Sequence, residues 1–270
     1  MLNTYPVNSL SDNYLWVMQR DSDPEVVIVD PGDKQKNLEF LEANNLIPVA
    51  ILITHQHYDH TGAIEALVNR YPDVKIYCHD TPPSVPPLRI DLPISDRITH
   101  PVKDGDHIVI DELGIEFDVT AIPGHTQDHV AYIGEGGVFV GDTIFGCGCG
   151  RLFSGTADQM CASLFKLSQL PADTKMYCAH EYTVDSMGFA DWVEPDNADL
   201  KRREKTDTAK QEKGIPTLPS TIGLECATNP FLRFREAPVI EAAEKWAGRK
   251  LTTDAEVFAT LRTWKDREYD

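Results

Sequence analysis

The sequence predicts an α+β protein in which a strand-rich portion is followed by a helical portion. Short apolar runs with turn residues between them fill the first two thirds of the 270-residue chain, and helical patterns separate several of these runs. After Tyr182 the character changes, and charged, helix-favouring segments dominate. We therefore expect two domains, residues 1–181 and residues 182–270.

The N-terminal portion begins with strands and helices in alternation. Apolar, β-branched runs predict strands over 14–18, 26–29, 49–53 and 74–78. Helical periodicity extends over 34–45, and a second helix over 63–68 stops before Pro72. Prolines are dense over 81–101. That density excludes a regular helix or a central strand and indicates an ordered surface excursion.

The rest of the chain divides into further strands and then helices. Four strands are predicted over 107–110, 115–122, 129–133 and 138–140, and a helix over 158–170 precedes a strand over 175–178. In the C-terminal domain we expect helices over 197–213, 237–246 and 253–268, with a loop over 214–229 between the first two.

The most informative stretch lies directly behind the predicted strand at 49–53. Residues 54–60 are Thr-His-Gln-His-Tyr-Asp-His, so the pattern His-x-His-x-Asp-His places four potential ligands within six residues. Imidazole and carboxylate are preferred ligands of zinc and similar divalent metals. The alternative, a polar loop with surface histidines, does not account for this density. The stretch therefore predicts a metal site.

Three more potential ligands stand where later strands end. His125 follows the strand that ends at Ile122, Asp142 follows Val140, and His180 follows the strand over 175–178. Loops at one edge of a rigid sheet can assemble such side chains into one site. The candidate ligand set is therefore His55, His57, Asp59, His60, His125, Asp142 and His180.

Composition and charge limit the kinds of partner. A formal charge of −18 argues against nucleic acid, including nuclease activity, because phosphate binding needs a basic face. An anionic substrate would need local positive charge. No apolar run is long enough to span a bilayer, and the N-terminus lacks a signal-peptide pattern. We expect a cytoplasmic monomer with reduced cysteines, no membrane partner and no nucleic-acid partner.

The seven candidate ligands, in this order, resemble the motifs of the metallo-β-lactamase superfamily. The tracts Gly141–Thr156 and Ala179–Thr183 resemble, within it, the glyoxalase II (hydroxyacylglutathione hydrolase) family, and the likeness runs over nearly the whole chain. The resemblance implies a four-layer αβ/βα metallo-β-lactamase sandwich with a C-terminal helical domain. One departure is Gln56, where the family commonly has histidine. That position is not a ligand, so the site is expected to persist with different neighbours around it.

The resemblance also implies two metal ions and the division of ligands between them. The first ion would be bound by His55, His57 and His125, the second by Asp59, His60 and His180, with Asp142 bridging. Zinc is expected, and iron or manganese would accept the same ligands. A water shared by two such ions ionises near neutrality and yields a hydroxide that attacks a carbonyl, which gives Asp59 and Asp142 catalytic roles.

The implied substrate is a glutathione thioester, S-D-lactoylglutathione, hydrolysed to glutathione and D-lactate in methylglyoxal detoxification. Arg262 and Lys265 lie three residues apart and share a helix face, which alone would indicate a solvated charged surface. The family has the same Arg-x-x-Lys contacting the glycine carboxylate of glutathione. Arg151 and Tyr182 match other glutathione contacts. Phe153 stands where some members have tyrosine, so one hydroxyl contact is expected to be absent.

Two other functions remain as alternatives. A glutathione persulfide dioxygenase of the same superfamily uses one iron and does not need the second ligand set, which is complete here. A non-catalytic metal-binding module is disfavoured because every ligand position is filled.

Several residues outside the ligand set have two interpretations. Asp30 either orients a ligand histidine or the loop, or it caps a turn. Cys147 and Cys149 could be thiol ligands, but a tight loop beside the substrate suits Gly-Cys-Gly-Cys-Gly better. The other four histidines are expected to be solvated or hydrogen-bonded: His79, His100, His107 and His129.

Overall fold

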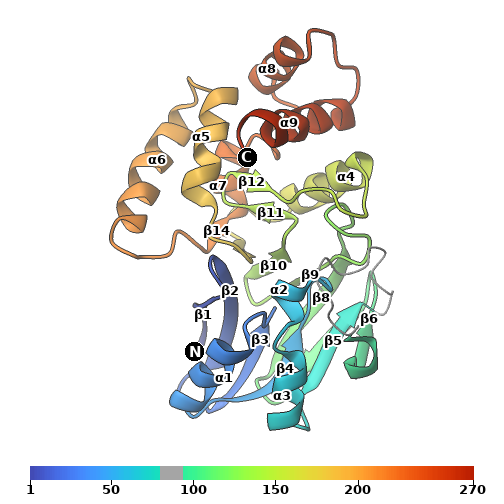
Figure 1. The fold of residues 1–270 in the computed structure, drawn as a ribbon, viewed down its shortest axis with the longest axis vertical. Coiled ribbons are helices and arrows are strands. Elements are labelled where there is room, and N and C mark those ends of the chain that lie inside the picture. The colour runs from blue at the N-terminus through green and yellow to red at the C-terminus, as the bar shows by residue number, and fades with distance from the viewer. Residues whose placement is uncertain (80–93) are drawn as a thin grey trace. The chain divides into compact units, whose positions relative to one another are not determined.

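The computed structural model describes residues 1–79 and 94–270 (Figure 1). The chain divides into two compact units, each described by itself below. Unit 1 comprises residues 1–121 and 126–141, and unit 2 comprises residues 122–125 and 142–270. Most of the proline-rich stretch over 81–101 lies outside the described residues.

Unit 1 contains a six-stranded sheet in the order β1-β2-β3-β4-β5-β6. The first three strands are antiparallel, and β3 to β6 are parallel. Pro101 lies in β6, the strand at one edge, where a missing N–H is tolerated. The strands are β1 (Leu2–Ser9), β2 (Asn13–Arg20), β3 (Glu25–Val29), β4 (Ile47–Leu52), β5 (Lys75–His79) and β6 (His100–Val102).

Helices of unit 1 cover one face of this sheet (Figure 1). They are α1 (Lys34–Ala43), α2 (Tyr58–Thr61) and α3 (Ile64–Arg70), with a short 3₁₀ turn at Ile94–Arg97. The side chain of Asp33 caps α1 by accepting from two backbone N–H groups of its first turn. Leu41 and Leu67 are fully buried against Ile28 and Ile51, and each such side chain contributes about 1.5–3 kcal/mol.

A second, antiparallel sheet of unit 1 contains β7 (His107–Ile110), β8 (Ile115–Ala121), β9 (Val130–Gly134) and β10 (Gly137–Gly141), in that order. Burial alternates along β7, as expected for a strand with one face against the core. The hydroxyl of Tyr132 lies 2.9 Å from the carbonyl oxygen of Ile53 and 3.1 Å from that of Tyr77. Unit 1 is therefore a sandwich of two sheets with helices on the outer face of the first.

Unit 2 is mainly helical. Its elements are the hairpin β11 (Ile144–Phe145) and β12 (Gly148–Cys149), α4 (Ala157–Ser168), β13 (Lys175–Cys178), α5 (Thr183–Val193), α6 (Ala198–Gln211), β14 (Ser220–Thr221), α7 (Ile222–Thr228), α8 (Ala237–Ala247) and α9 (Asp254–Glu268). The predicted helices are confirmed. The loop expected over 214–229 is wrong in part, because it contains β14 and α7, and α5 was not predicted.

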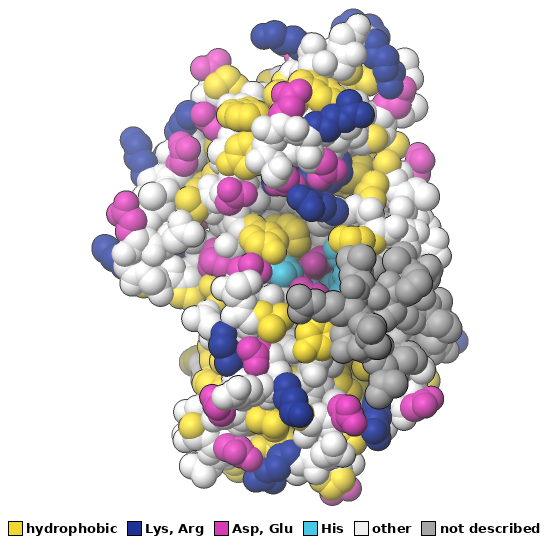
Figure 2. Space-filling model, in the orientation of Figure 1, with side chains coloured by type: hydrophobic (Ala, Val, Ile, Leu, Met, Phe, Trp, Pro, Cys, Tyr) yellow, Lys and Arg dark blue, Asp and Glu magenta, His cyan; other side chains and the backbone are white. Residues whose placement is uncertain are grey.

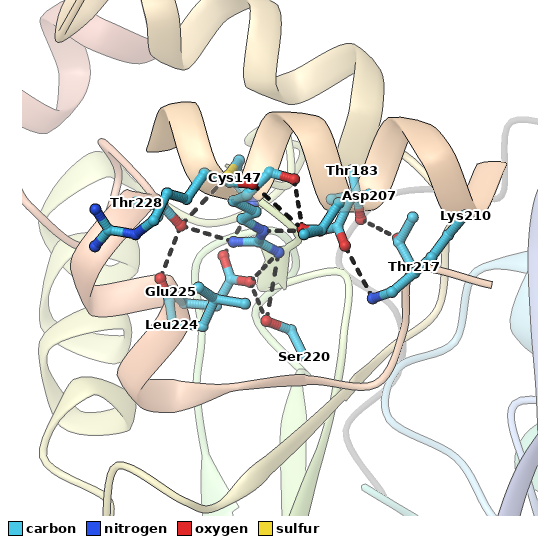
Figure 3. A network of polar contacts seen from close by, with 12 residues as sticks. Cys147, Thr183, Asp207, Lys210, Thr217, Ser220, Leu224, Glu225 and Thr228 are labelled. Atoms are coloured by element: carbon cyan, nitrogen blue, oxygen red, sulfur yellow. Dashed lines mark hydrogen bonds and ion pairs between the residues drawn. The ribbon is translucent and has the colours of Figure 1, made fainter. Parts of the chain in front are cut away.

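A buried network of ion pairs and hydrogen bonds joins α6 to α7 in unit 2 (Figure 3). The Arg203 guanidinium lies 2.7 Å from a carboxylate oxygen of Glu225 and 3.1 Å from one of Asp207, and it donates to the Thr228 hydroxyl at 2.7 Å. Burial alone would lower the pKa of Arg203, but the attraction of Glu225 and the hydrogen bonds to Glu225 and Asp207 together outweigh it and raise the pKa. Arg203 therefore stays charged inside the unit.

Removing this buried cation should destabilise the protein. Arg203→Met would leave Glu225 and Asp207 buried without their partner, and breaking one side of a buried ion pair costs about 3–5 kcal/mol. The matched control is Arg202→Met on the same helix, whose exposed pair with Asp199 should contribute about 0–1 kcal/mol. Urea denaturation measures both free energies of unfolding. Equal losses in the two variants would contradict a stabilising role for the network.

Candidate metal centre and substrate contacts

Unit 1 presents its four candidate ligands immediately after β4, as two convergent pairs. His55 Nε2 and His57 Nδ1 lie 3.0 Å apart. Asp59 Oδ2 lies 3.5 Å from His60 Nε2. His55 and His60 are fully buried. The nitrogens of His55 and His57 thus lie close together, and so do the His60 nitrogen and the Asp59 oxygen. A bound cation would require such pairs of donor atoms.

Asp30, which directly follows β3, contacts the segment that carries these candidate ligands. Its carboxylate accepts from the Thr54 backbone N–H at 2.9 Å and from the Thr54 hydroxyl at 2.7 Å. One of its oxygens lies 3.0 Å from His60 Nδ1, so the other ring nitrogen of His60 is directed toward Asp59. Asp30 is buried. Of the two interpretations of Asp30, these contacts favour the one in which it orients the loop and a candidate ligand histidine.

Sequence reasoning missed three residues that support the unit 1 ligands. Asn13 Nδ2 donates to Asp59 at 3.0 Å. The His129 ring, buried and near the Val130 carbonyl, stacks on His55 with centroids 4.6 Å apart. Asp128 accepts from the backbone N–H of residue 56 at 3.1 Å. None lies in a recognisable motif, and only His129 carried a signal, as a histidine beside a strand.

Gln56 does not act as a ligand in this arrangement. Its side-chain amide donates to the carbonyl oxygen of His79 at the end of β5, at 3.2 Å. The departure from the family pattern therefore changes a hydrogen bond of the loop and leaves the ligand pairs of unit 1 in place.

Unit 2 supplies His125, Asp142 and His180, arranged around one carboxylate. Asp142 Oδ2 lies 3.5 Å from His125 Nε2, and Asp142 Oδ1 lies 3.4 Å from His180 Nε2. His125 Nδ1 donates to the carbonyl oxygen of Arg151 at 2.8 Å, which fixes the tautomer and keeps Nε2 available. A Cβ at Gly150 would lie 2.1 Å from the Asp142 carbonyl oxygen, so this loop requires glycine.

The donor set fits a divalent metal. All seven predicted ligands are among the described side chains able to hold an ion. Imidazole nitrogens and carboxylate oxygens are the donors that zinc, iron and manganese share. His125 donates its second ring nitrogen to a carbonyl oxygen, and the second ring nitrogen of His60 lies 3.0 Å from a carboxylate oxygen of Asp30; metal-binding histidines have partners of this kind.

The predicted substrate cations of unit 2 come together around two carboxylates. The Arg262 guanidinium lies 2.8 Å from Asp266 and 2.7 Å from Asp270, and Lys265 pairs with Asp270. Arg151 Nη2 lies 3.3 Å from Asp270. Arg262 and Lys265 are buried, whereas the Arg151 side chain is 60% exposed. Three cations against two carboxylates leave the cluster a net charge of +1.

This local charge contrasts with the rest of the surface. On the face drawn in Figure 2, basic and acidic side chains of the described residues are interspersed rather than gathered by sign. Taken alone, Arg262 and Lys265 would indicate a solvated charged face. In unit 2 both side chains are instead engaged with partners.

Two predicted aromatic contacts lie against candidate ligand histidines of unit 2. The Tyr182 ring stacks on His180, with centroids 4.7 Å apart and an angle of 13° between the planes. The Phe153 ring meets His125 edge to face at 5.1 Å and is 43% exposed. Both rings are therefore placed where a substrate near these histidines would touch them.

The cysteines beside Asp142 belong to the tight loop of the β11–β12 hairpin. Cys147 occupies the left-handed region, with φ 55°, between the paired residues Phe145 and Gly148. Burial raises the pKa of Cys147 to about 12 and that of Cys149 to about 11. Neither thiol belongs to a group of described side chains able to hold an ion, which favours the loop interpretation.

Comparison with known proteins places the chain. Residues 13–180, which include every candidate ligand, match the family model "Metallo-beta-lactamase superfamily". Residues 181–268 match "Hydroxyacylglutathione hydrolase C-terminus". The chain is 43% identical to a hydroxyacylglutathione hydrolase of Nitrosomonas europaea, covering 98% of this chain and 96% of that protein. It is 44% identical to that of Nitrosomonas eutropha, covering 98% and 99%.

The chain belongs to the hydroxyacylglutathione hydrolase family. Members are thioester hydrolases, so the predicted enzyme class is confirmed. The BLEG-1 B3 metallo-β-lactamase is similar in structure, with a TM-score of 0.61 and 25% identity over 86% of this chain and 99% of that one. TTHA1623 in a di-iron-bound form matches with a TM-score of 0.55 and 25% identity over 84% and 99%.

The comparisons also bear on the predicted fold. The α+β metallo-β-lactamase fold with a C-terminal helical region is confirmed. No helix among residues 1–79 and 94–270 is long and apolar enough to cross a bilayer.

Removing Asp142 should cost the protein metal. Its carboxylate faces two imidazoles, and loss of even an outer partner of a ligand lowers metal affinity about 10- to 100-fold. Asp142→Ala, dialysed against buffered zinc, should hold less metal than wild type by mass spectrometry. Asp118→Ala removes an exposed carboxylate that pairs with His107 and serves as the control. Wild-type metal content in Asp142→Ala would rule out a ligand role.

Proposed function

We propose that this protein hydrolyses S-D-lactoylglutathione and similar 2-hydroxyacylglutathiones to glutathione and D-lactate at a site with two metal ions. The observation that carries the proposal is the Asp142 carboxylate, which directs one oxygen to His125 and the other to His180. Membership of the hydroxyacylglutathione hydrolase family over the full chain supports the substrate class.

The ligand division follows the family pattern. His55, His57 and His125 would hold the first ion, Asp59, His60 and His180 the second, and Asp142 would bridge them. The similar TTHA1623, described in a di-iron-bound form, supports two ions. We propose zinc, with iron or manganese as alternatives, because all three accept nitrogen and carboxylate donors. When bound, such a metal pair polarises a carbonyl oxygen and activates water.

The chain's own residues hold these groups and bind the substrate. Asp30 holds His60 and the backbone of Thr54, while the Arg151 carbonyl oxygen holds His125. A thioester suits a site without a dedicated acid, because the leaving thiolate has a pKa of roughly 8.5 and departs unprotonated. Asp59 and Asp142 are proposed as the catalytic carboxylates because they are the acidic members of the ligand set.

The helical region confers substrate selection in this proposal. Residues 1–181 form the catalytic domain and residues 182–270 the substrate-binding domain, a division supported by the two family models that meet at residues 180 and 181. Arg151, Arg262 and Lys265 form a cluster of net charge +1 suited to the glycine carboxylate of glutathione. Tyr182 and Phe153 would contact the rest of the peptide. We further propose a cytoplasmic monomer that engages neither nucleic acid nor membrane.

The decisive experiment is turnover of S-D-lactoylglutathione with metal content measured on the same sample. Thioester cleavage that rises with metal loading is expected. Oxygen consumption on glutathione persulfide is measured alongside, because oxygen uptake without thioester cleavage would favour the dioxygenase alternative. A metal-free protein that is folded and inactive on both substrates would favour a non-catalytic module.

Removing a cation of the cluster should weaken substrate binding more than it slows the chemistry. Arg151→Ala is expected to raise KM about 5- to 10-fold with little change in kcat, because the contact lies far from the reacting carbon. Arg262→Ala should act in the same direction, with folding checked by urea denaturation because Arg262 is buried. The control is Arg235→Ala, which removes an exposed ion pair with Asp254. A fall in kcat at constant KM would contradict the assignment.

A further inference from the structure

The cation cluster of unit 2 already holds a carboxylate. Each oxygen of the Asp270 side chain faces a different cation: Oδ1 pairs with Lys265, and Oδ2 lies 2.7 Å from Arg262 Nη2 and 3.3 Å from Arg151. The Asp270 side chain is 14% exposed. This two-oxygen arrangement is the one in which a substrate carboxylate would engage the same cations.

The other hydrogen-bonding capacity of Arg262 is also used within unit 2. Its Nη1 donates to the Cys149 carbonyl oxygen at 2.9 Å, and its Nε and Nη2 donate to Asp266 at 3.1 and 2.8 Å. Asp266 lies one turn along α9 and is fixed to that helix, whereas Asp270 lies beyond its end. Of these partners, Asp270 is the carboxylate that reaches all three cations, whereas Asp266 faces only Arg262 and Arg151.

The turn after α9 aims Asp270 at the cluster. The backbone N–H groups of Tyr269 and Asp270 both donate to the Lys265 carbonyl oxygen, at 3.0 and 2.9 Å, which folds the chain back over the last turn. The Tyr269 hydroxyl donates to the Asp185 carbonyl oxygen at 2.6 Å, and its ring packs edge to face on Phe189 and Trp192. Tyr269 thus anchors the segment, while the Asp270 side chain can rotate away.

Charge favours this occupancy over an empty cluster. Burial alone would raise the pKa of Asp270, but the hydrogen bond and the attraction of Lys265, with that of Arg262, lower it. The carboxylate is therefore ionised wherever these cations are charged. The exposed Arg151 forms the open side of the cluster, so an incoming anion would approach there.

We propose that Asp270 is a built-in competitor for the carboxylate subsite, so that the glycine carboxylate of a substrate must displace the Asp270 side chain to reach the three cations. The inference rests on the proposed function, in which Arg151, Arg262 and Lys265 bind the glycine carboxylate. Apparent affinity falls by the fraction of protein in which a site is open, so Asp270 raises KM for thioesters whose carboxylate enters this subsite and does not affect those that leave the subsite unused.

The test compares Asp270→Asn with wild type on two substrates. These are S-D-lactoylglutathione and the same thioester with its glycine carboxylate converted to the amide. Asp270→Asn should lower KM for the acid substrate about 3- to 10-fold, because the neutral asparagine side chain competes poorly for the cations. KM for the amide substrate should stay unchanged, because that substrate has no carboxylate to place in the subsite. Asp270→Glu keeps the charge and should retain a KM near that of wild type.

The matched control is Glu268→Gln. It removes one negative charge at the same end of α9, where the Glu268 carboxylate accepts from the Trp246 indole and contacts none of the cluster cations. An unchanged KM for both substrates is expected. If Glu268→Gln lowers KM for the acid as much as Asp270→Asn, long-range charge explains the effect and the competitor role is wrong.

Other outcomes overturn the inference directly. An unchanged or raised KM in Asp270→Asn would show that Asp270 does not compete or that it orders the cations for substrate. An equal fall in KM for the acid and amide substrates would show that Asp270 does not compete with the glycine carboxylate of the substrate.

A binding measurement separates this inference from the proposed function. Calorimetric Kd values for the non-hydrolysable thioether S-methylglutathione should fall in Asp270→Asn in the same proportion as KM. If wild type does not cleave lactoylglutathione, the proposed function fails, and this binding experiment still tests Asp270. If wild type cleaves it and Asp270→Asn binds the thioether no more tightly, only the inference fails.

Discussion

A histidine that binds a metal almost always has its other ring nitrogen held by an oxygen, which points the ligating nitrogen at the ion. Both units have such an oxygen behind the ring. In unit 1 the oxygen belongs to the carboxylate of Asp30, and in unit 2 it is the backbone carbonyl of Arg151. The cost of ordering the rings is met during folding, so little reorganisation is left for metal binding.

Unit 2 concentrates this support in one short segment. The backbone from Asp142 to Arg151 carries a ligand, a two-residue hairpin loop and the carbonyl that holds His125. Asn229 donates to the carbonyl oxygens of Phe145 and Gly148 at 3.2 and 2.9 Å. Glu225, the partner of Arg203, accepts from the Cys147 N–H at 2.9 Å. The buried ion pairs thus connect the stability of unit 2 to the loop that follows the candidate ligand Asp142.

The sequence predicted the parts of this arrangement that depend on local pattern. The strands at 26–29 and 49–53 are continuous apolar runs, and the ligand motif is dense and contiguous. Helix α7 escaped prediction because its buried residues include Glu225 and Thr228, so its inward face is polar and no apolar stripe exists. The residues around His55 and Asp59 were missed because Asn13 and His129 reach them from elsewhere in the chain.

The cation cluster marks a different limit of sequence reasoning. A spacing of three places Arg262 and Lys265 on one helix face, but whether such a face is solvated or buried depends on which anions fold back onto it. Here Asp266 and Asp270 do so, and the cluster keeps a charge of only +1 within a chain of −18. Without these anions, the burial of unpaired cations would cost folding free energy. Partial neutralisation therefore reconciles stable packing with the local positive charge that the proposed anionic substrate requires.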